Sequence, residues 1–82
     1  MERHGKYIIV SSNTYCEVPI LFSNAIEHSI FLGYYNKSNI VSAGFFSIDS
    51  DNNVKVFGES FSLKIKSNIE DGQIIKRFLG FF

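Results

Sequence analysis

The chain has 82 residues, 45% hydrophobic and 20% charged, a composition typical of one globular domain (residues 1–82) and not of a disordered segment. Eight basic and eight acidic side chains give a formal net charge of zero, which argues against binding to nucleic acid or anionic lipid. The lone cysteine, Cys16, excludes an internal disulfide, and no apolar run approaches the ~20 residues of a membrane span. Residues 1–6 also lack the apolar core of a signal peptide, so we expect a soluble, cytoplasmic protein that does not bind membranes.

The first part of the chain predicts a β-hairpin. Residues 7–10 are β-branched or aromatic, residues 11–14 favour a turn, and residues 17–22 are mostly apolar. Pro19 has no backbone N–H to donate, so we expect the second strand to lie at a sheet edge or to be irregular at this point.

A helix is predicted over residues 24–32, because Ser23 is a favourable N-cap and Gly33 is typical of a helix end. Its buried stripe would consist of three residues spaced four apart, Phe22, Ile26 and Ile30. A polar loop that begins with Tyr34 and Tyr35 follows.

Residues 40–48 form the longest predicted strand, and the turn-forming residues 49–53 connect it to a strand over residues 54–57. Gly44 lies within the longer strand and indicates a close approach by another backbone or by a side chain such as Phe78.

The apolar positions change parity after this hairpin. Val54 and Val56 are even-numbered, whereas Phe61, Leu63 and Ile65 are odd-numbered, so the inward face switches near Gly58-Glu59. A two-residue hairpin loop at Gly58-Glu59 and a β-bulge at Gly58 within one long strand both account for the switch. The bulge would give strand 40–48 a partner of matching length.

The last part of the chain predicts a strand followed by a helix. Apolar and polar side chains alternate over residues 61–66, and Ser67 with Glu70 three residues later matches a capping box. Gly80 indicates the end of the helix. One arc of the helix is apolar and consists of Ile74, Ile75, Phe78 and Leu79. We expect this arc to pack on the apolar side of strand 61–66.

Together these elements predict an α+β fold in the order β-β-α-β-β-α. A small antiparallel sheet of four to five strands would carry both helices packed on one face.

One segment has the spacing of metal ligands. Asp49, Asp51 and Asn53 are placed like the first ligands of a calcium loop. Val54 and Ser60 stand where that loop needs a glycine and a bidentate glutamate, so we interpret the segment as a solvated turn.

His28 and Cys16 are the remaining residues with catalytic potential. Glu27 precedes His28, but adjacent residues of a helix do not face each other. Cys16 would be a nucleophile if His28 reached it, but we interpret it as a small buried or half-buried thiol. No ligand spacing, phosphate-binding loop or catalytic triad stands out. We therefore predict no enzymatic activity, no cofactor and no metal site.

One candidate interaction surface combines outward basic side chains of the last strand and helix with two loop aromatics. Its members are Lys64, Lys66, Lys76, Arg77, Tyr34 and Tyr35. Such a set suits single-stranded nucleic acid. At zero net charge we favour ordinary solubilising charge, with the strand lysines guarding against edge-to-edge aggregation.

Phe81 and Phe82 would be costly to expose to water. Either Phe82 extends the buried stripe of the last helix or both rings dock on a second subunit, and the second alternative predicts a homodimer.

Four stretches carry a resemblance that covers half of the chain. They are Val41-Ser42-Ala43-Gly44-Phe45, Val56-Phe57-Gly58-Glu59-Ser60, Ser62-Leu63-Lys64, and Glu70-Asp71 with Ile74-Ile75. The pattern resembles a group of short bacterial and phage-borne hypothetical proteins, which implies a bacterial or viral cytoplasmic setting but no activity, cofactor or binding residue.

The hypothesis that we take from the sequence is a small, self-associating accessory protein without enzymatic activity. It would bind a protein partner through an exposed sheet edge or the aromatic surface. The alternative is an accessory protein that binds single-stranded nucleic acid weakly.

Overall fold

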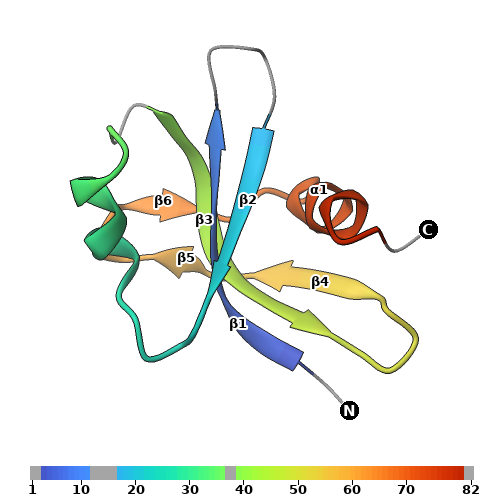
Figure 1. Ribbon diagram of the computed structural model, residues 1–82. Coiled ribbons are helices and arrows are strands. Elements are labelled where there is room, and N and C mark those ends of the chain that lie inside the picture. Colours follow the sequence, from blue (N-terminus) through green and yellow to red (C-terminus); the bar gives the residue numbers. More distant parts are fainter. Residues whose placement is uncertain (1–2, 12–16, 37–38, 81–82) are drawn as a thin grey trace.

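A four-stranded antiparallel sheet in the order β2-β1-β3-β4 forms the centre of the computed structural model, which describes residues 3–11, 17–36 and 39–80 (Figure 1). Its strands are β1 (Arg3–Ser11), β2 (Glu17–Phe22), β3 (Ile40–Ile48) and β4 (Val54–Phe57). The other elements are the 3-10 helix η1 (His28–Gly33), the short strands β5 (Glu59–Ser60) and β6 (Ile65–Lys66), and helix α1 (Asp71–Phe78). The predicted mixed α+β class, both predicted hairpins of the sheet and the edge position of the strand with Pro19 are confirmed.

Strand β1 is buried on both sides. Four consecutive residues, Tyr7 to Val10, are each at most 7% exposed. Because neighbouring side chains of a strand point to opposite faces, an apolar run of this kind needs cover on both faces of the sheet. Two separate apolar clusters provide it.

The first cluster lies between the sheet and α1, on what we name the α1 face. Its buried members are Tyr7, Ile9, Phe46, Ile48 and Ile75. The second lies on the opposite side, which we name the η1 face, and its buried members are Ile8, Val10, Ile40, Ala43 and Leu63. Phe31 of η1 and Ile65 of β6 pack against this second cluster.

The prediction that both helices pack on one face is therefore wrong. Figure 1 shows α1 on one side of the sheet and η1, with β5 and β6, on the other. The reason lies in β1, whose odd and even positions are both apolar, so that each face of the sheet must be covered.

The predicted helix over residues 24–32 is also wrong. The Ser23 hydroxyl accepts a hydrogen bond from the Ala25 N–H at 3.1 Å, but this closes only a local turn. Glu27 is extended, with φ −75° and ψ 140°, and the helix that follows is a six-residue 3-10 helix. Because a 3-10 helix repeats every three residues, His28 and Phe31 both face the sheet.

Residues 58–66 follow neither alternative of the sequence analysis. Gly58 has a positive φ of 74°, β4 ends before it, and the chain enters the separate two-stranded sheet of β5 and β6. Most of predicted strand 61–66 is a turn that contains Lys64 at φ 58°, and Phe61 is 83% exposed. Leu63 is buried, but on the η1 face, so the expected packing of this segment on α1 is wrong.

Gly44 confirms the predicted close approach, although Phe78 is not its neighbour. A Cβ atom at this position would lie 2.7 Å from the Phe57 carbonyl oxygen and 3.0 Å from the Ser67 Cβ. Ser67 occupies this place because its backbone N–H and its hydroxyl both donate to the Gly58 carbonyl, at 3.1 and 2.8 Å.

Helix α1 begins at Asp71, so the predicted capping box of Ser67 and Glu70 does not form. Asp71 fixes the first turn instead, because its Oδ2 accepts the Asn68 N–H at 2.8 Å. Gly80 has a φ of 77° and ends the helix as predicted.

Candidate functional site

The outer edge of β2 is one of the two open edges of the sheet. Within the described part of the chain β2 pairs only with β1, so the backbone groups on its other edge have no strand partner. The register places Pro19 opposite Ile9 and Ile20 opposite Ile8. Residues 17, 19 and 21 therefore lie on the α1 face, and residues 18, 20 and 22 lie on the η1 face.

The other edge of the sheet, β4, is better protected. It has four residues against six in β2, and it exposes the charged side chain of Lys55. The N-terminal turn of α1 also lies close to it, since a Cβ atom on Gly72 would be 3.1 Å from the Val54 carbonyl oxygen. Short length and lysine side chains are typical defences of edge strands, and β2 has only Pro19 and a terminal glutamate.

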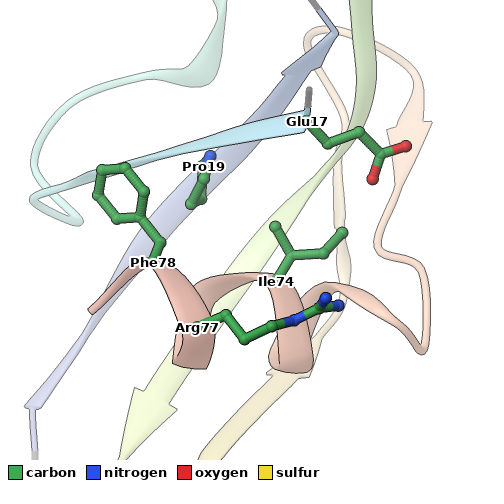
Figure 2. A pocket seen from close by; sticks show the side chains of 5 residues that line it. All are labelled: Glu17, Pro19, Ile74, Arg77 and Phe78. Atoms are coloured by element: carbon green, nitrogen blue, oxygen red, sulfur yellow. The ribbon is translucent and has the colours of Figure 1, made fainter. Parts of the chain in front are cut away.

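A hollow of about 480 Å³ borders β2 on the α1 face. Figure 2 shows that the strand contributes Glu17 and Pro19, and that α1 contributes Ile74, Arg77 and Phe78. Phe78 is 60% exposed, which corrects the prediction that it belongs to the buried arc of the helix. Among the described residues, neither Glu17 nor Arg77 forms an ion pair, so both charges are available to a partner.

A second hollow, of about 370 Å³, borders the same strand on the η1 face. It is lined by Ile20, Ile26, Ile30, Phe31, Tyr34 and Tyr35. None of these side chains carries a charge at neutral pH. We name this set the η1 patch.

Two residues of the η1 patch were predicted to be buried. Ile26 lies before η1 and is 37% exposed. Ile30 is 57% exposed because the three-residue repeat of η1 turns other side chains towards the sheet. Phe31 connects the patch to the buried cluster of the η1 face, and its ring centroid lies 4.6 Å from that of Phe22. The patch is therefore an exposed apolar surface on a fixed base.

The His28 side chain is buried inside the fold, where it forms contacts of its own, and it lines neither of the two hollows beside β2. It is 3% exposed, its Nε2 lies 2.9 Å from the Gly44 carbonyl oxygen, and its ring meets Phe22 and Phe45 edge-on. Burial lowers the pKa of its imidazole. Since a carbonyl only accepts, Nε2 carries the proton of the neutral ring.

A second buried polar pair joins the sheet to α1. The Tyr7 hydroxyl donates to Asp71 Oδ2 at 2.5 Å, and both residues are at most 2% exposed. Burial raises the pKa of the Tyr7 phenol, and the neighbouring carboxylate of Asp71 raises it further. Since Asp71 also accepts the Asn68 N–H, this pair has a positioning role for the helix.

The calcium-like segment is a hairpin turn between β3 and β4. The Asp49 carboxylate accepts the N–H groups of Asp51 and Asn53 at 2.9 and 3.0 Å and the Asn53 side-chain amide at 3.2 Å. These hydrogen bonds lower the pKa of the Asp49 carboxyl, and the bond from the Asn53 backbone N–H has the largest effect. In residues 3–11, 17–36 and 39–80 no group of three or more histidine, cysteine or acidic residues could hold a metal ion. Cys16 lies outside these ranges.

The structure separates the residues of the predicted interaction surface. Tyr34 and Tyr35 belong to the η1 patch, whereas Arg77 lines the hollow on the α1 face and Lys76 is half-buried on the same helix. Lys64 and Lys66 are exposed on the segment that covers the η1 face.

The four basic side chains therefore come from segments on opposite faces of the sheet and do not form one basic surface. Phe81 and Phe82 lie outside the described residues. The sequence reasoning missed Glu17, Ile20 and Ile30 as surface residues. The signal that could have found them is the edge strand itself, which holds Pro19 but no lysine or arginine.

Comparisons of the chain with protein-family models, curated proteins and solved structures found no match. The resemblance to short bacterial and phage proteins therefore stays a prediction. None of the helices in the described part of the chain is long and apolar enough to cross a membrane.

Proposed function

We propose that this chain is a small accessory protein without enzymatic activity that binds an extended segment of another polypeptide at the open edge of β2. One observation carries the proposal: β2 is the longer of the two edge strands, holds no lysine or arginine, and has a hollow beside it on each face of the sheet. We propose the cytoplasm as its compartment, because a single cysteine supports no internal disulfide.

Strand addition would use both of the hollows that border β2. A segment that pairs with β2 would form backbone hydrogen bonds along the open edge, although Pro19 supplies only its carbonyl and no N–H. Its successive side chains would point to opposite faces, so every second one would enter the hollow beside Pro19 and the others would meet Ile20. The backbone bonds would supply affinity, and the two hollows would select side chains.

The two hollows favour different side chains in the partner. The η1 patch holds no charged group and exposes Ile30 and Tyr34, so it favours branched or aromatic residues. The hollow on the α1 face holds Glu17 and Arg77 next to the exposed ring of Phe78, so it also accommodates polar or charged residues. The expected partner segment is apolar at every second position.

A library of displayed random peptides, selected on the immobilised full chain, tests the proposal. The bound peptides should alternate apolar residues with others. Ile30→Asp should weaken their binding by about tenfold, because a charge would face the apolar side chains of the peptide. Phe61→Asp is the matched control, since Phe61 is 83% exposed on the turn between β5 and β6, and it should leave binding unchanged.

Equal binding to the wild-type and Ile30→Asp proteins would contradict the proposal. If the chain instead binds single-stranded nucleic acid, it should shift the mobility of single-stranded oligonucleotides at low salt. Lys64→Glu and Lys76→Glu should then each weaken this shift.

A further inference from the structure

We infer that the polypeptide bound at the open edge is β2 of a second copy of this chain. Two copies would pair their β2 strands antiparallel around a two-fold axis perpendicular to the sheet. The result would be one continuous sheet of eight strands, with α1 of both copies on the same face. This inference rests on the proposed function and names the partner of that site.

The side chains of β2 suit pairing with themselves. Residues opposite each other in an antiparallel pair lie on the same face, so a two-fold axis beside Pro19 would place the apolar Val18 of each copy opposite Ile20 of the other. They would meet beside the η1 patch, the hollow without charged side chains. β2 itself thus has the apolar alternation expected of the partner segment.

The charges on the α1 face complement each other across a two-fold axis. This face presents one acidic group, Glu17, and one basic group, Arg77, at the edge of β2, and neither has an ion-pair partner among the described residues. In a symmetric interface, a contact from Glu17 of one copy to Arg77 of the other is made twice. A formal net charge of zero leaves no overall repulsion between the copies.

The exposed ring of Phe78 has a place in the same interface. Phe78 lies beside Pro19 in the hollow on the α1 face (Figure 2) and is 60% exposed. A second β2 strand along the open edge would cover the outer side of this hollow. The ring would then be removed from water by the same contact that pairs the strands.

Charge reversal in the full-length chain tests the inference. Sedimentation equilibrium should show a dimer for the wild type, and Glu17→Arg or Arg77→Glu alone should raise its dissociation constant about tenfold, because each creates two like-charge contacts. The double variant Glu17→Arg/Arg77→Glu should restore the wild-type value. Both residues are exposed, and matching circular dichroism spectra should confirm that the variants fold.

Three outcomes would overturn the inference: a monomer at millimolar concentration, a dimer that neither single variant weakens, or a double variant that does not recover. The displayed peptides separate this failure from that of the proposed function. A monomer that binds peptides in an Ile30-dependent manner contradicts self-pairing and leaves strand addition standing. A monomer that binds no peptide contradicts both.

Discussion

The two faces of the sheet are covered by different kinds of structure. On the α1 face one regular helix packs over Tyr7 and Ile9, whereas on the η1 face a 3-10 helix and two strands of two residues each pack over Ile8 and Val10. Both covers bury their central residue almost completely, Ile75 to 0% and Leu63 to 1% exposure. Burial of a sheet face therefore does not require a regular helix or strand, provided that one large side chain fills the gap.

The largest effects should come from those two central residues. Ile75→Ala and Leu63→Ala should each lower the free energy of unfolding by about 3 kcal/mol, because each removes buried methyl groups and leaves a cavity. Urea denaturation measures both changes. Phe61→Ala is the exposed control and should change stability by less than about 0.5 kcal/mol. A cost below about 1 kcal/mol for Leu63→Ala alone would contradict an equal role of the two covers, because it would show that the η1 face opens separately.

The buried polar pair of the α1 face should give the next largest effect. Asp71→Ala leaves the Tyr7 hydroxyl without its acceptor and the first turn of α1 without its bond from Asn68, so we expect a loss of about 2–3 kcal/mol. Tyr7→Phe should cost about 1–2 kcal/mol, since the Asn68 bond remains. Urea denaturation of both single variants and the double variant gives the coupling energy. Additive costs would show that the hydroxyl and the carboxylate act independently.

The buried polar residue of the η1 face should make stability depend on pH. The pKa of His28 in the folded protein lies below its ordinary value of about 6.5, so the unfolded chain binds a proton first as the pH falls. Stability should therefore be constant above about pH 6.5 and should decrease below it, with a slope of at most about 1.4 kcal/mol per pH unit for one proton. Asp49, whose pKa is lowered, contributes only below about pH 4.

Denaturation between pH 7.5 and 5.5 measures this slope. His4→Gln should serve as the background, so that His28 is the only remaining histidine. Adding His28→Phe should flatten the profile within this window. An unchanged slope would assign the acid sensitivity to another group.

The comparison also shows which parts of the fold the sequence could predict. The strands of the sheet could be predicted because apolar runs alternate with turn residues in the sequence. Pro19 indicated that its strand lies at the edge of the sheet. Helix α1 could be predicted from its apolar arc. The predicted start of the helix was too early, because the Ser67 hydroxyl donates to the Gly58 carbonyl and does not cap the helix.

The structure that covers the η1 face could not be predicted from the sequence, and the reason is physical. The spacing of Phe22, Ile26 and Ile30 favours an α-helix, but the chain uses a three-residue repeat that places His28 and Phe31 inward. Residues 61–66 alternate like a strand, but Lys64 takes a positive φ and the segment turns. As a result, the exposed Ile30 could not be assigned to the candidate site from the sequence. Tyr34 and Tyr35 were predicted as surface residues, but as members of a basic surface and not of the apolar η1 patch.

The smallest effect should come from a pair of buried serines, one on each face. Ser42 lies opposite Ile9 on the α1 face and is 1% exposed, and its Oγ has no hydrogen-bond partner among the described residues. Ser60 is equally buried in β5, but its Oγ accepts the Leu63 N–H at 3.1 Å. Since an unpaired buried hydroxyl is unfavourable, Ser42→Ala should raise the free energy of unfolding by about 0.5–1 kcal/mol. Ser60→Ala should lower it by about 1–2 kcal/mol, because it leaves a buried N–H unpaired. Thermal and urea denaturation of the two variants should thus give opposite signs for the same substitution, and a loss for both would show that Ser42 has a partner in solution.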